Sequence, residues 1–296
     1  MAKKLKKWTV FDVVLVLFML FILVITLYPF LNILAISLNN AVDTAKGGIH
    51  IWPRDFTFAN YTEIFGSNDR LLQAFLMSVI RTVVGTVTGL IASTMLAYTL
   101  SRRDFVFNKI VGLLLVLTMF ISGGLIPDYM LIRHLGLINN FWVYILPVLI
   151  SAFNVIIIRS FMDNIPKALE ESAKIDGAND FTIFTKIIVP LCLPVIATIA
   201  LFLAVGQWNS WFDTYLYTRA NANLTTLQYE LMKILDNTNI SSGDITSQNG
   251  QVIAKQINPQ SIKMAITIIA TTPILLVYPF LQKYFVTGLT IGAVKS

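Results

Sequence analysis

Two groups of polar side chains interrupt the long apolar stretches of this sequence. The first group combines amides, a carboxylate and two indoles: Asn154, Gln207, Trp208, Asn209, Trp211 and Asp213. Amides can hydrogen-bond the hydroxyl groups of a polar solute, and indole rings can cover an apolar face of it. Polar groups inside membrane spans are costly and usually face the bundle interior, so these residues are candidates for a solute pathway. Alternatively, the two tryptophans anchor at the outer membrane interface and Asn209 bonds to a neighbouring helix.

The second polar group lies in the stretch EESAKIDGANDFTIFTKIIVPLCLP, residues 170–194. Pro166 suits the first turn of a helix, because its missing N–H would be unpaired there anyway. Two glutamates, Glu170 and Glu171, follow early in this helix, where its dipole favours negative charge. Gly177 then permits a left-handed cap or a sharp bend.

A second helical stretch follows this glycine, with Phe181, Phe184 and Ile188 on one face. The segment 164–188 is therefore predicted to be a helix–glycine–helix. One face can pack on a helix bundle, while the charged face points to water or to a partner.

Other side chains that commonly do chemistry are scarce. The one cysteine, Cys192, excludes an intrachain disulfide, and the two histidines, His50 and His134, lie in separate loops. The sequence contains no GxxxxGK[ST] phosphate loop and no nucleophile–base constellation. We therefore expect neither an enzyme nor a metal site, and no cofactor bound by this chain.

The elements that must position these groups are membrane helices. Of the 296 residues, 56% are hydrophobic and only 13% are charged, whereas a soluble domain carries about 25% charged residues. A helix that crosses a bilayer needs roughly 20 apolar residues. The uncharged stretches predict a single all-α membrane domain over 1–296, with six spans near 11–36, 75–100, 108–127, 139–159, 188–213 and 264–282.

Basic residues predict the orientation of these spans. With both termini inside, the inside segments hold thirteen bases in 64 residues and the outside segments hold eight in 95. Because bases are enriched in cytoplasmic loops, this favours cytoplasmic N- and C-termini. The net charge of +6 is then a topology signal that also suits anionic lipid headgroups, and not a footprint for nucleic acid.

Two outside loops carry recognisable features. The first has aromatic residues that predict an aromatic belt or a compact segment lying partly at the membrane interface: Trp52, Phe56, Phe58, Tyr61 and Phe65. The third, residues 214–263, is long and polar, with leucines at helical spacing and then a Ser/Asn/Gly-rich stretch. A loop of that length is usually functional or disordered, so it is a candidate partner contact. Arg81 is expected at the outer end of the second span, with its charge reaching the headgroups.

The spacing within the segment 164–188 resembles a known motif. Glu171-Ser172-Ala173, then Gly177, then Ile187-x-Val189-Pro190, fits the pattern E-A-A-x(3)-G-x(9)-I-x-L-P. This is similar to the cytoplasmic coupling segment of permease subunits in binding-protein-dependent ABC importers. Ser172 and Val189 are the two departures, and both are small.

Further stretches resemble the carbohydrate-uptake class of these permeases, including its smaller maltose permease subunit and the complex-sugar group. They are Tyr28-Pro29-Phe30, GGIHIWPRDFTFANYTEIF (47–65), AYTLSRRDF (97–105), GQWNSWFD (206–213) and the tail QKYFVTGLTIGAVKS. The resemblance covers most of the chain. It implies the type I ABC importer permease fold in a bacterial cell membrane, with a cytoplasmic coupling helix between spans four and five.

The resemblance also implies partners and roles. A second homologous permease would complete the pathway, a cytoplasmic ATPase dimer would bind ATP and Mg²⁺, and an extracytoplasmic lipid-anchored binding protein would deliver an oligosaccharide. The coupling helix would dock on the ATPase through Glu171, Ser172, Ala173, Asp176 and Gly177. The loop 214–263 could enter the cleft of the binding protein, and the C-terminal tail could reach the ATPase.

Other functions remain open at this point. An ABC importer for a non-sugar solute would share the same motif. An ion-coupled secondary carrier would require buried acids and paired half-helices, whereas the predicted spans hold almost no carboxylates. A membrane scaffold without transport activity would not need a coupling helix.

Overall fold

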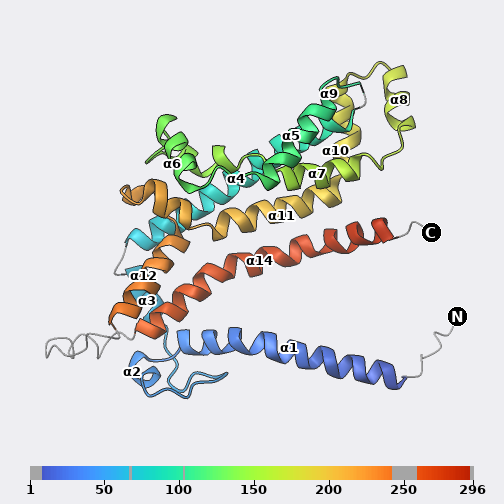
Figure 1. Ribbon diagram of the computed structural model, residues 1–296. Coiled ribbons are helices and arrows are strands. Elements are labelled where there is room, and N and C mark those ends of the chain that lie inside the picture. Colours follow the sequence, from blue (N-terminus) through green and yellow to red (C-terminus); the bar gives the residue numbers. More distant parts are fainter. Residues whose placement is uncertain (1–8, 67–68, 103, 242–258, 294–296) are drawn as a thin grey trace. The chain divides into compact units, whose positions relative to one another are not determined.

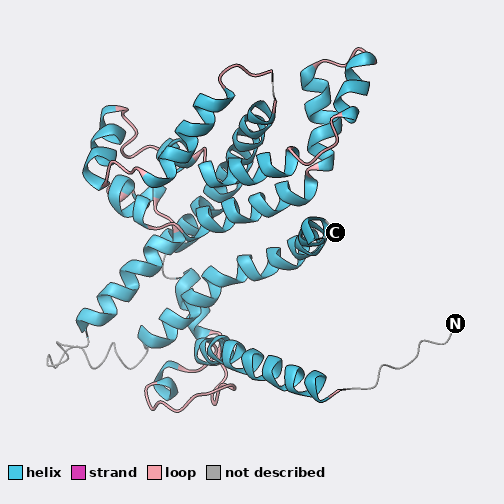
Figure 2. Cartoon of the chain, turned by 45° about the vertical axis from the view of Figure 1, so that its right-hand side comes forward, coloured by secondary structure: helices cyan, strands magenta, loops and turns pink. Residues whose placement is uncertain are grey.

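The computed structural model describes residues 9–66, 69–102, 104–241 and 259–293. These residues form helices joined by short connections, and among them there is no β-strand (Figure 2). The chain divides into two compact units, which are treated separately below. Unit 1 comprises Met1–Asp69 and Lys233–Thr271, and unit 2 comprises Arg70–Met232 and Thr272–Ser296. The helical fold class predicted from the sequence is confirmed.

Figure 1 labels the main helices along the chain. Unit 1 contains α1 Val10–Ser37, α2 Ala41–Thr44 and α3 Ala59–Gly66. Apart from its first residue, α4 Asp69–Ser101 belongs to unit 2, and the residues of α12 Leu227–Ser241 and α14 Pro259–Ala293 are divided between the two units. The remaining elements are α5 Asn108–Phe120, α6 Leu125–His134, η1 Phe141–Tyr144, η2 Leu146–Val148, α7 Ala152–Met162, α8 Ala168–Ile175, α9 Asp180–Ile183, η3 Phe184–Ile188, α10 Val189–Leu191, α11 Leu193–Asn209, η4 Thr214–Thr218 and η5 Ala222–Leu224. Of these, η3 and η4 are π-helical turns.

In unit 1, α1 is a long apolar helix with a defined start. Thr9 caps it by accepting from the backbone N–H of Asp12 at 3.3 Å, and the Asp12 carboxylate accepts from the backbone N–H of Thr9 at 2.9 Å. This reciprocal pair is a capping box. No residue of α1 before Ala35 is buried. An apolar helix whose side chains are so exposed is suited to face lipid.

In unit 2, one apolar core joins four parts of the chain. It is built from buried residues of α4, α7, the segment 164–188 and α11: Ala97, Leu100, Val155, Ile158, Met162, Ala173, Ile183, Ile188, Cys192, Val195, Ile196 and Ile199. Further along α4, Gly85 allows close approach of α11, because a Cβ there would come within 2.6 Å of the amide nitrogen of Gln207. The core therefore fixes the segment 164–188 on the ends of α4 and α7.

Helix lengths agree with several membrane spans. Three described helices are long and apolar enough to cross a bilayer, namely α1, α4 from Arg70, and Gln260–Val277 of α14. The number rises to five if each of two bent pairs counts as one span: Phe141–Val148 with Ala152–Met162, and Asp180–Leu191 with Leu193–Asn209. Helix α5 is apolar but shorter.

Glycine and proline explain where the helices differ from the predicted spans. The stretch 108–127 stops being helical at Phe120, and Gly124, with φ of +88°, precedes α6. The stretch 139–159 breaks around Pro147 and bends by 49°. The stretch 188–213 bends by 81° beside Cys192, between two prolines that remove helical hydrogen bonds.

Candidate functional site

The segment 164–188 folds as a helix, a glycine turn and a second helix, as the sequence predicts. Gly177 has φ of +79° and ends α8 in the left-handed region. The Ala178 N–H donates to the Ala173 carbonyl at 2.9 Å, and the Gly177 N–H donates to the Lys174 carbonyl at 3.0 Å. These two bonds form a Schellman motif, which satisfies the last carbonyls of α8 and turns the chain sharply.

The second arm of the segment begins with its own cap. The Asn179 side chain accepts from the backbone N–H of Thr182 at 2.8 Å and starts α9. The next turn, Phe184–Ile188, is π-helical. Ile183 and Ile188, five residues apart, are both fully buried. The wider turn therefore places side chains five residues apart on one face.

The π-helical turn holds one residue more than an α-helical turn, and this changes which side chains of the second arm face the core. The sequence placed Phe181, Phe184 and Ile188 on one face, as in a regular α-helix. In the structure Phe181 is exposed, while Ile183 takes the inward position. Phe184 packs beside the ring of Tyr98 in α4, with centroids 5.0 Å apart.

Most of the predicted docking residues lie on the outer side of the bend. Glu171, Ser172, Asp176 and Gly177 are exposed. Ala173 is 8% exposed and packs into the core of unit 2. Beside the exposed residues, Ile175 is 86% exposed, so a large apolar side chain is displayed at the tip of the bend.

Arg102, at the end of α4, joins both arms of the segment 164–188. One guanidinium nitrogen pairs with Glu170 on α8, and another pairs with Asp180 at the start of α9. The guanidinium carbon lies 5.1 Å from the ring centroid of Tyr98, and Asp104 lies 4.0 Å from Nε. The Arg102 side chain is only 11% exposed. A planar fork that holds two carboxylates at once fixes the angle between the two arms.

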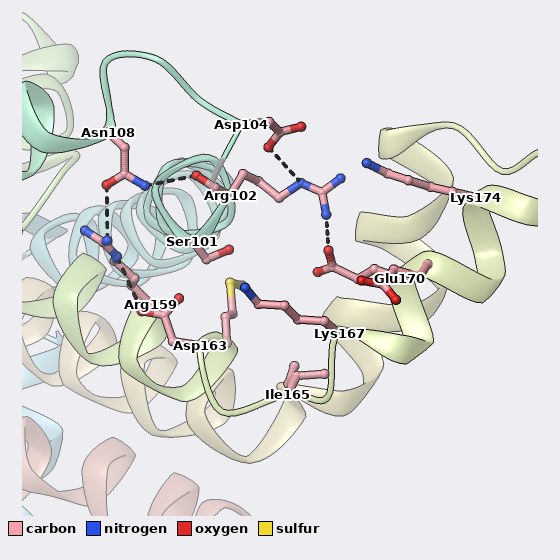
Figure 3. Close-up of a pocket in the computed structure, with 12 residues that line it drawn as sticks. Ser101, Arg102, Asp104, Asn108, Arg159, Asp163, Ile165, Lys167, Glu170 and Lys174 are labelled. Carbon is pink, nitrogen blue, oxygen red and sulfur yellow. Dashed lines mark hydrogen bonds and ion pairs between the residues drawn. The ribbon is translucent and has the colours of Figure 1, made fainter.

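A cavity of about 580 Å³ opens beside this arginine (Figure 3). Four basic and four acidic side chains are among those that line it. The bases are Arg102, Arg159, Lys167 and Lys174, and the acids are Asp104, Asp163, Glu170 and Glu171. Asn108 closes one side, donating to the carbonyls of Leu100 at 2.7 Å and Arg102 at 3.0 Å, and accepting from Arg159 at 3.1 Å. No cluster of three metal-ligating side chains occurs in the described parts of the chain. The cavity can offer ion pairs and hydrogen bonds to another protein surface.

The bend at Gly177 leads to a direct prediction. Replacement of Gly177 by alanine should cost about 1–2 kcal/mol, because an L-residue is disfavoured in the left-handed region. Nothing lies within 4 Å of the added Cβ, so the cost is conformational and not steric. We expect amide hydrogen exchange at residues 177 and 178 to rise about tenfold. Gly177→Asn is the matched control, since asparagine tolerates this region better; equal exchange in Gly177→Ala and the wild type would contradict the prediction.

A second polar cluster, distant in the chain from the first, surrounds Arg81. The Arg81 side chain is 2% exposed and pairs with Asp213, with Nη1 3.1 Å from Oδ1. Its Nε donates to Gln207 at 2.8 Å, and its guanidinium carbon lies 4.4 Å from the ring centroid of Tyr144. The expectation that Arg81 reaches lipid headgroups is therefore wrong: the ion pair and the ring bury its charge inside unit 2.

The hydroxyl of Tyr144 extends this cluster toward the residues that follow α11. It contacts the Thr218 hydroxyl at 2.5 Å and donates to the Leu224 carbonyl at 2.6 Å. Nearby, Ser78 of α4 accepts from the backbone N–H of Leu227 at 2.8 Å. The cluster thus anchors the start of the loop 214–263 to α4.

The other predicted pathway residues occupy different surroundings. Asn154 is buried in α7, and Trp208 is buried with its ring 5.9 Å from that of Phe75. Asn209 is exposed and accepts from Gln228 at 3.3 Å. Trp211 lies against the rings of Phe212 and Tyr215. The structure therefore brings Gln207 and Asp213 together around Arg81, and leaves Asn209 exposed and Trp211 half-buried.

Sequence reasoning missed the roles of three residues: Arg102, Tyr98 and Tyr144. Tyr98 and Arg102 entered only as members of the stretch AYTLSRRDF, without roles of their own, and Tyr144 did not stand out from its apolar surroundings. Arg102 lies 68 residues from Glu170. The acidic residues near the bend were the one available signal, because a base elsewhere in the chain can pair with them.

Several helices of membrane-spanning length define this chain as a multi-pass membrane protein. Residues 8–291 match the family described as "binding-protein-dependent transport system inner membrane component". The chain belongs to this family. It is thus a membrane component of a transport system, in agreement with the resemblance found in its sequence.

Named relatives extend over nearly the whole chain. It is 40% identical to the polygalacturonan/rhamnogalacturonan transport system permease protein YtcP of Bacillus subtilis (strain 168), over 97% of this chain and 98% of the relative. It is 41% identical to protein LplC of the same strain, over 98% and 97%. A crystal structure of a bacterial ABC transporter involved in the import of the acidic polysaccharide alginate contains a similar chain, with a TM-score of 0.83, 27% identity, and coverage of 96% of this chain and 100% of that one.

Proposed function

We propose that this chain is a permease subunit of an ATP-driven importer that takes up oligosaccharides derived from polysaccharides. Its relatives are named for polygalacturonan and rhamnogalacturonan transport and, at 30% identity, for trehalose transport in Mycobacterium tuberculosis (strain CDC 1551 / Oshkosh). The similar solved chain belongs to an alginate importer. The common feature of these proteins is carbohydrate import.

In the proposed assembly the chain crosses the bacterial membrane six times, with both termini in the cytoplasm. A second permease completes the pathway, and a lipid-anchored binding protein delivers the sugar. A solved complex of the bacterial alginate ABC transporter contains an alginate pentasaccharide-bound periplasmic protein, although at 16% identity its chain is a guide to the fold alone. A cytoplasmic ATPase dimer holds ATP and Mg²⁺ and supplies the energy.

The single observation that carries this proposal is the display of residues at the bend of the segment 164–188. Ala173, Ile183 and Ile188 bury the inner side of the segment in the core of unit 2. The outer side presents Ile175 and Phe181 with acidic groups beside them. Exposed apolar side chains rimmed by charge are typical of a protein-binding surface. We propose that this surface is the coupling helix and that it docks on the ATPase.

Docking there would connect ATP binding with movement of the spans. The first arm is tied to α4 through Arg102, and the second arm runs through α10 into α11. Displacement of the bend would therefore reach two long helices as a rigid-body motion, which is a common form of switching transition. Stiffness is the physical requirement, and the Schellman turn and the Arg102 pairs both supply it.

The proposed pathway residues fall into two groups. Gln207 and Asp213 are engaged by Arg81, so their role is to hold α11 against α4. Asn154, Trp208, Asn209 and Trp211 remain candidates for sugar contact, since amides and indoles suit that ligand. The proposed contact between the loop 214–263 and the binding protein depends largely on residues 242–258, which lie outside the described residues. The same holds for the end of the C-terminal tail.

The docking surface can be tested by a charge placed at the bend. In the co-expressed transporter, Ile175→Asp should reduce ATPase co-purification with the permease by at least tenfold, because an aspartate cannot fill an apolar pocket on the partner. Leu135→Asp is the matched control, since Leu135 is also a strongly exposed apolar residue and lies on the predicted outer side, between the spans predicted near 108–127 and 139–159. Retention of the ATPase in Ile175→Asp would overturn the docking assignment. The substrate class is tested separately, by comparing the uptake of labelled oligosaccharides with the uptake of labelled amino acids and phosphate.

A further inference from the structure

The loop that follows α1 in unit 1 folds back along the helix it has just left. The Asn32 side-chain amide donates to the carbonyls of Ile49 and His50, both at 2.8 Å. One turn deeper, the Tyr28 hydroxyl lies 3.1 Å from Nδ1 of His50. In Figure 1 this loop leaves α2 and returns beside α1. The chain thus retraces the last turns of α1 before it reverses again. We call residues 47–54 the return loop.

The base of the return loop is held rigidly. Gly47 and Gly48 both have positive φ and reverse the chain. Arg54 donates to the Gly47 carbonyl at 2.6 Å and to the Asp43 carboxylate at 2.9 Å. Hydrogen bonds from Asn39 and Arg54 hold the pKa of Asp43 below its usual value, so this carboxylate stays charged at neutral pH.

Side-chain packing fixes the depth to which the return loop descends. Ile49 is buried against Ala35 and Ile36 of α1. With a rise of about 1.5 Å per residue, Asn32 lies about 7.5 Å and Tyr28 about 13.5 Å below the end of α1 at Ser37. The tip of the loop therefore does not extend beyond the helix but lies well below its end.

The same arithmetic locates the membrane boundary on α1. A hydrocarbon core of about 30 Å corresponds to about 20 helical residues. Counted from Asp12, whose charge requires the headgroup region, about 20 residues end at Asn32. Asn32 is also the residue that bonds the return loop. The tip of the loop thus lies at the level where hydrocarbon gives way to headgroups.

The side chains at the tip suit that level. Trp52 is 82% exposed and Ile51 is 46% exposed, and the apolar side chains of α1 beside them are exposed as well. Tryptophan is enriched at membrane interfaces, where its ring is amphipathic. Lys46 and Arg54, by contrast, lie at the base of the loop. Apolar residues therefore gather at the deep end and charged residues at the shallow end.

We infer that the tip of the return loop, Ile51 and Trp52, inserts into the interfacial layer of the bilayer beside α1. The occupant of this surface is lipid, because the exposed tip continues the lipid-suited face of α1 at the same depth. The inference concerns unit 1 alone and holds whatever solute is transported.

The test uses the full chain, purified with its accompanying subunits, in phosphatidylcholine/phosphatidylglycerol nanodiscs. Trp52→Cys carries a bimane label, and Lys46→Cys at the base of the loop is the matched control. The wild type, whose single cysteine is buried, is the labelling blank. Quenching is measured with nitroxide-labelled lipids and with aqueous iodide.

The label at position 52 should be quenched by the lipid-borne nitroxide at least threefold more than the label at 46, and iodide should show the reverse order. Both positions are exposed, so neither substitution should prevent folding. If iodide reaches position 52 as readily as position 46, the tip lies in water and the inference fails. If neither quencher reaches position 52, a protein surface covers the tip, and the inference also fails.

Discussion

Replacement of Arg81 by methionine is expected to lower the stability of the folded protein severely. Arg81 is almost completely buried, and its guanidinium is the partner of both Asp213 and Gln207. Removal of one member of a buried ion pair costs about 3–5 kcal/mol, and here Asp213, whose side chain is 21% exposed, would lose its charged partner. We expect a clear fall in thermal stability in detergent and in the yield of folded permease.

Two further variants distinguish the effect of breaking the ion pair on stability from the effect of merely removing a positive charge. Arg219→Gln removes an exposed arginine whose guanidinium carbon lies 5.7 Å from the Tyr215 ring centroid, and it should change the melting temperature little. Arg81→Met combined with Asp213→Leu should recover part of the lost stability, because no unpaired charge remains. An Arg81→Met protein that melts like the wild type would show that the pair contributes nothing.

The second large effect is expected at Arg102, in transport and not in stability. Arg102→Gln removes the common partner of Glu170 and Asp180, so that both arms lose the ion pairs that tie them to the end of α4. If the segment 164–188 transmits motion from the ATPase, uptake should fall at least tenfold while ATP hydrolysis continues. The measurement is the ratio of sugar transported to ATP hydrolysed in proteoliposomes.

Controls for Arg102 are available in the same region. In Arg102→Lys the ratio of sugar transported to ATP hydrolysed should stay nearly as low as in Arg102→Gln, because an ammonium group cannot hold two carboxylates in a planar fork. Lys109→Gln removes an exposed base at the start of α5 and should leave the ratio unchanged. A normal ratio in Arg102→Gln, with the ATPase still bound, would refute the transmitting role of this arginine while leaving the docking surface intact.

Much of this architecture could be predicted from local chemistry. Long uncharged runs located α1 and α4, and the proline, acids and glycine between 164 and 188 predicted a bent helical pair that the structure confirms. Family membership, inferred from the spacing around Gly177, is confirmed as well. These features depend on residues close together in the sequence, where propensity and capping act.

Features that depend on distant residues could not be found in this way. Arg81 and Asp213 are 132 residues apart, and nothing local marks them as partners. The breaks near Gly124, Pro147 and Cys192 shorten or bend helices that hydropathy alone treats as continuous. Apolar runs predict which segments of the chain can lie in lipid, whereas glycine and proline determine whether the helix in such a segment is straight, bent or interrupted.

The π-helical turn at Phe184–Ile188 has a consequence for comparing related sequences. A π turn holds one residue more than an α turn, and each residue of an α-helix rotates the chain by about 100°. A one-residue gap aligned between the bend and α11 would therefore mark a change in helical phase, not a shorter loop. A homologue with that gap would present a different set of side chains at the bend, and residue-by-residue transfer of contacts between the two would fail there.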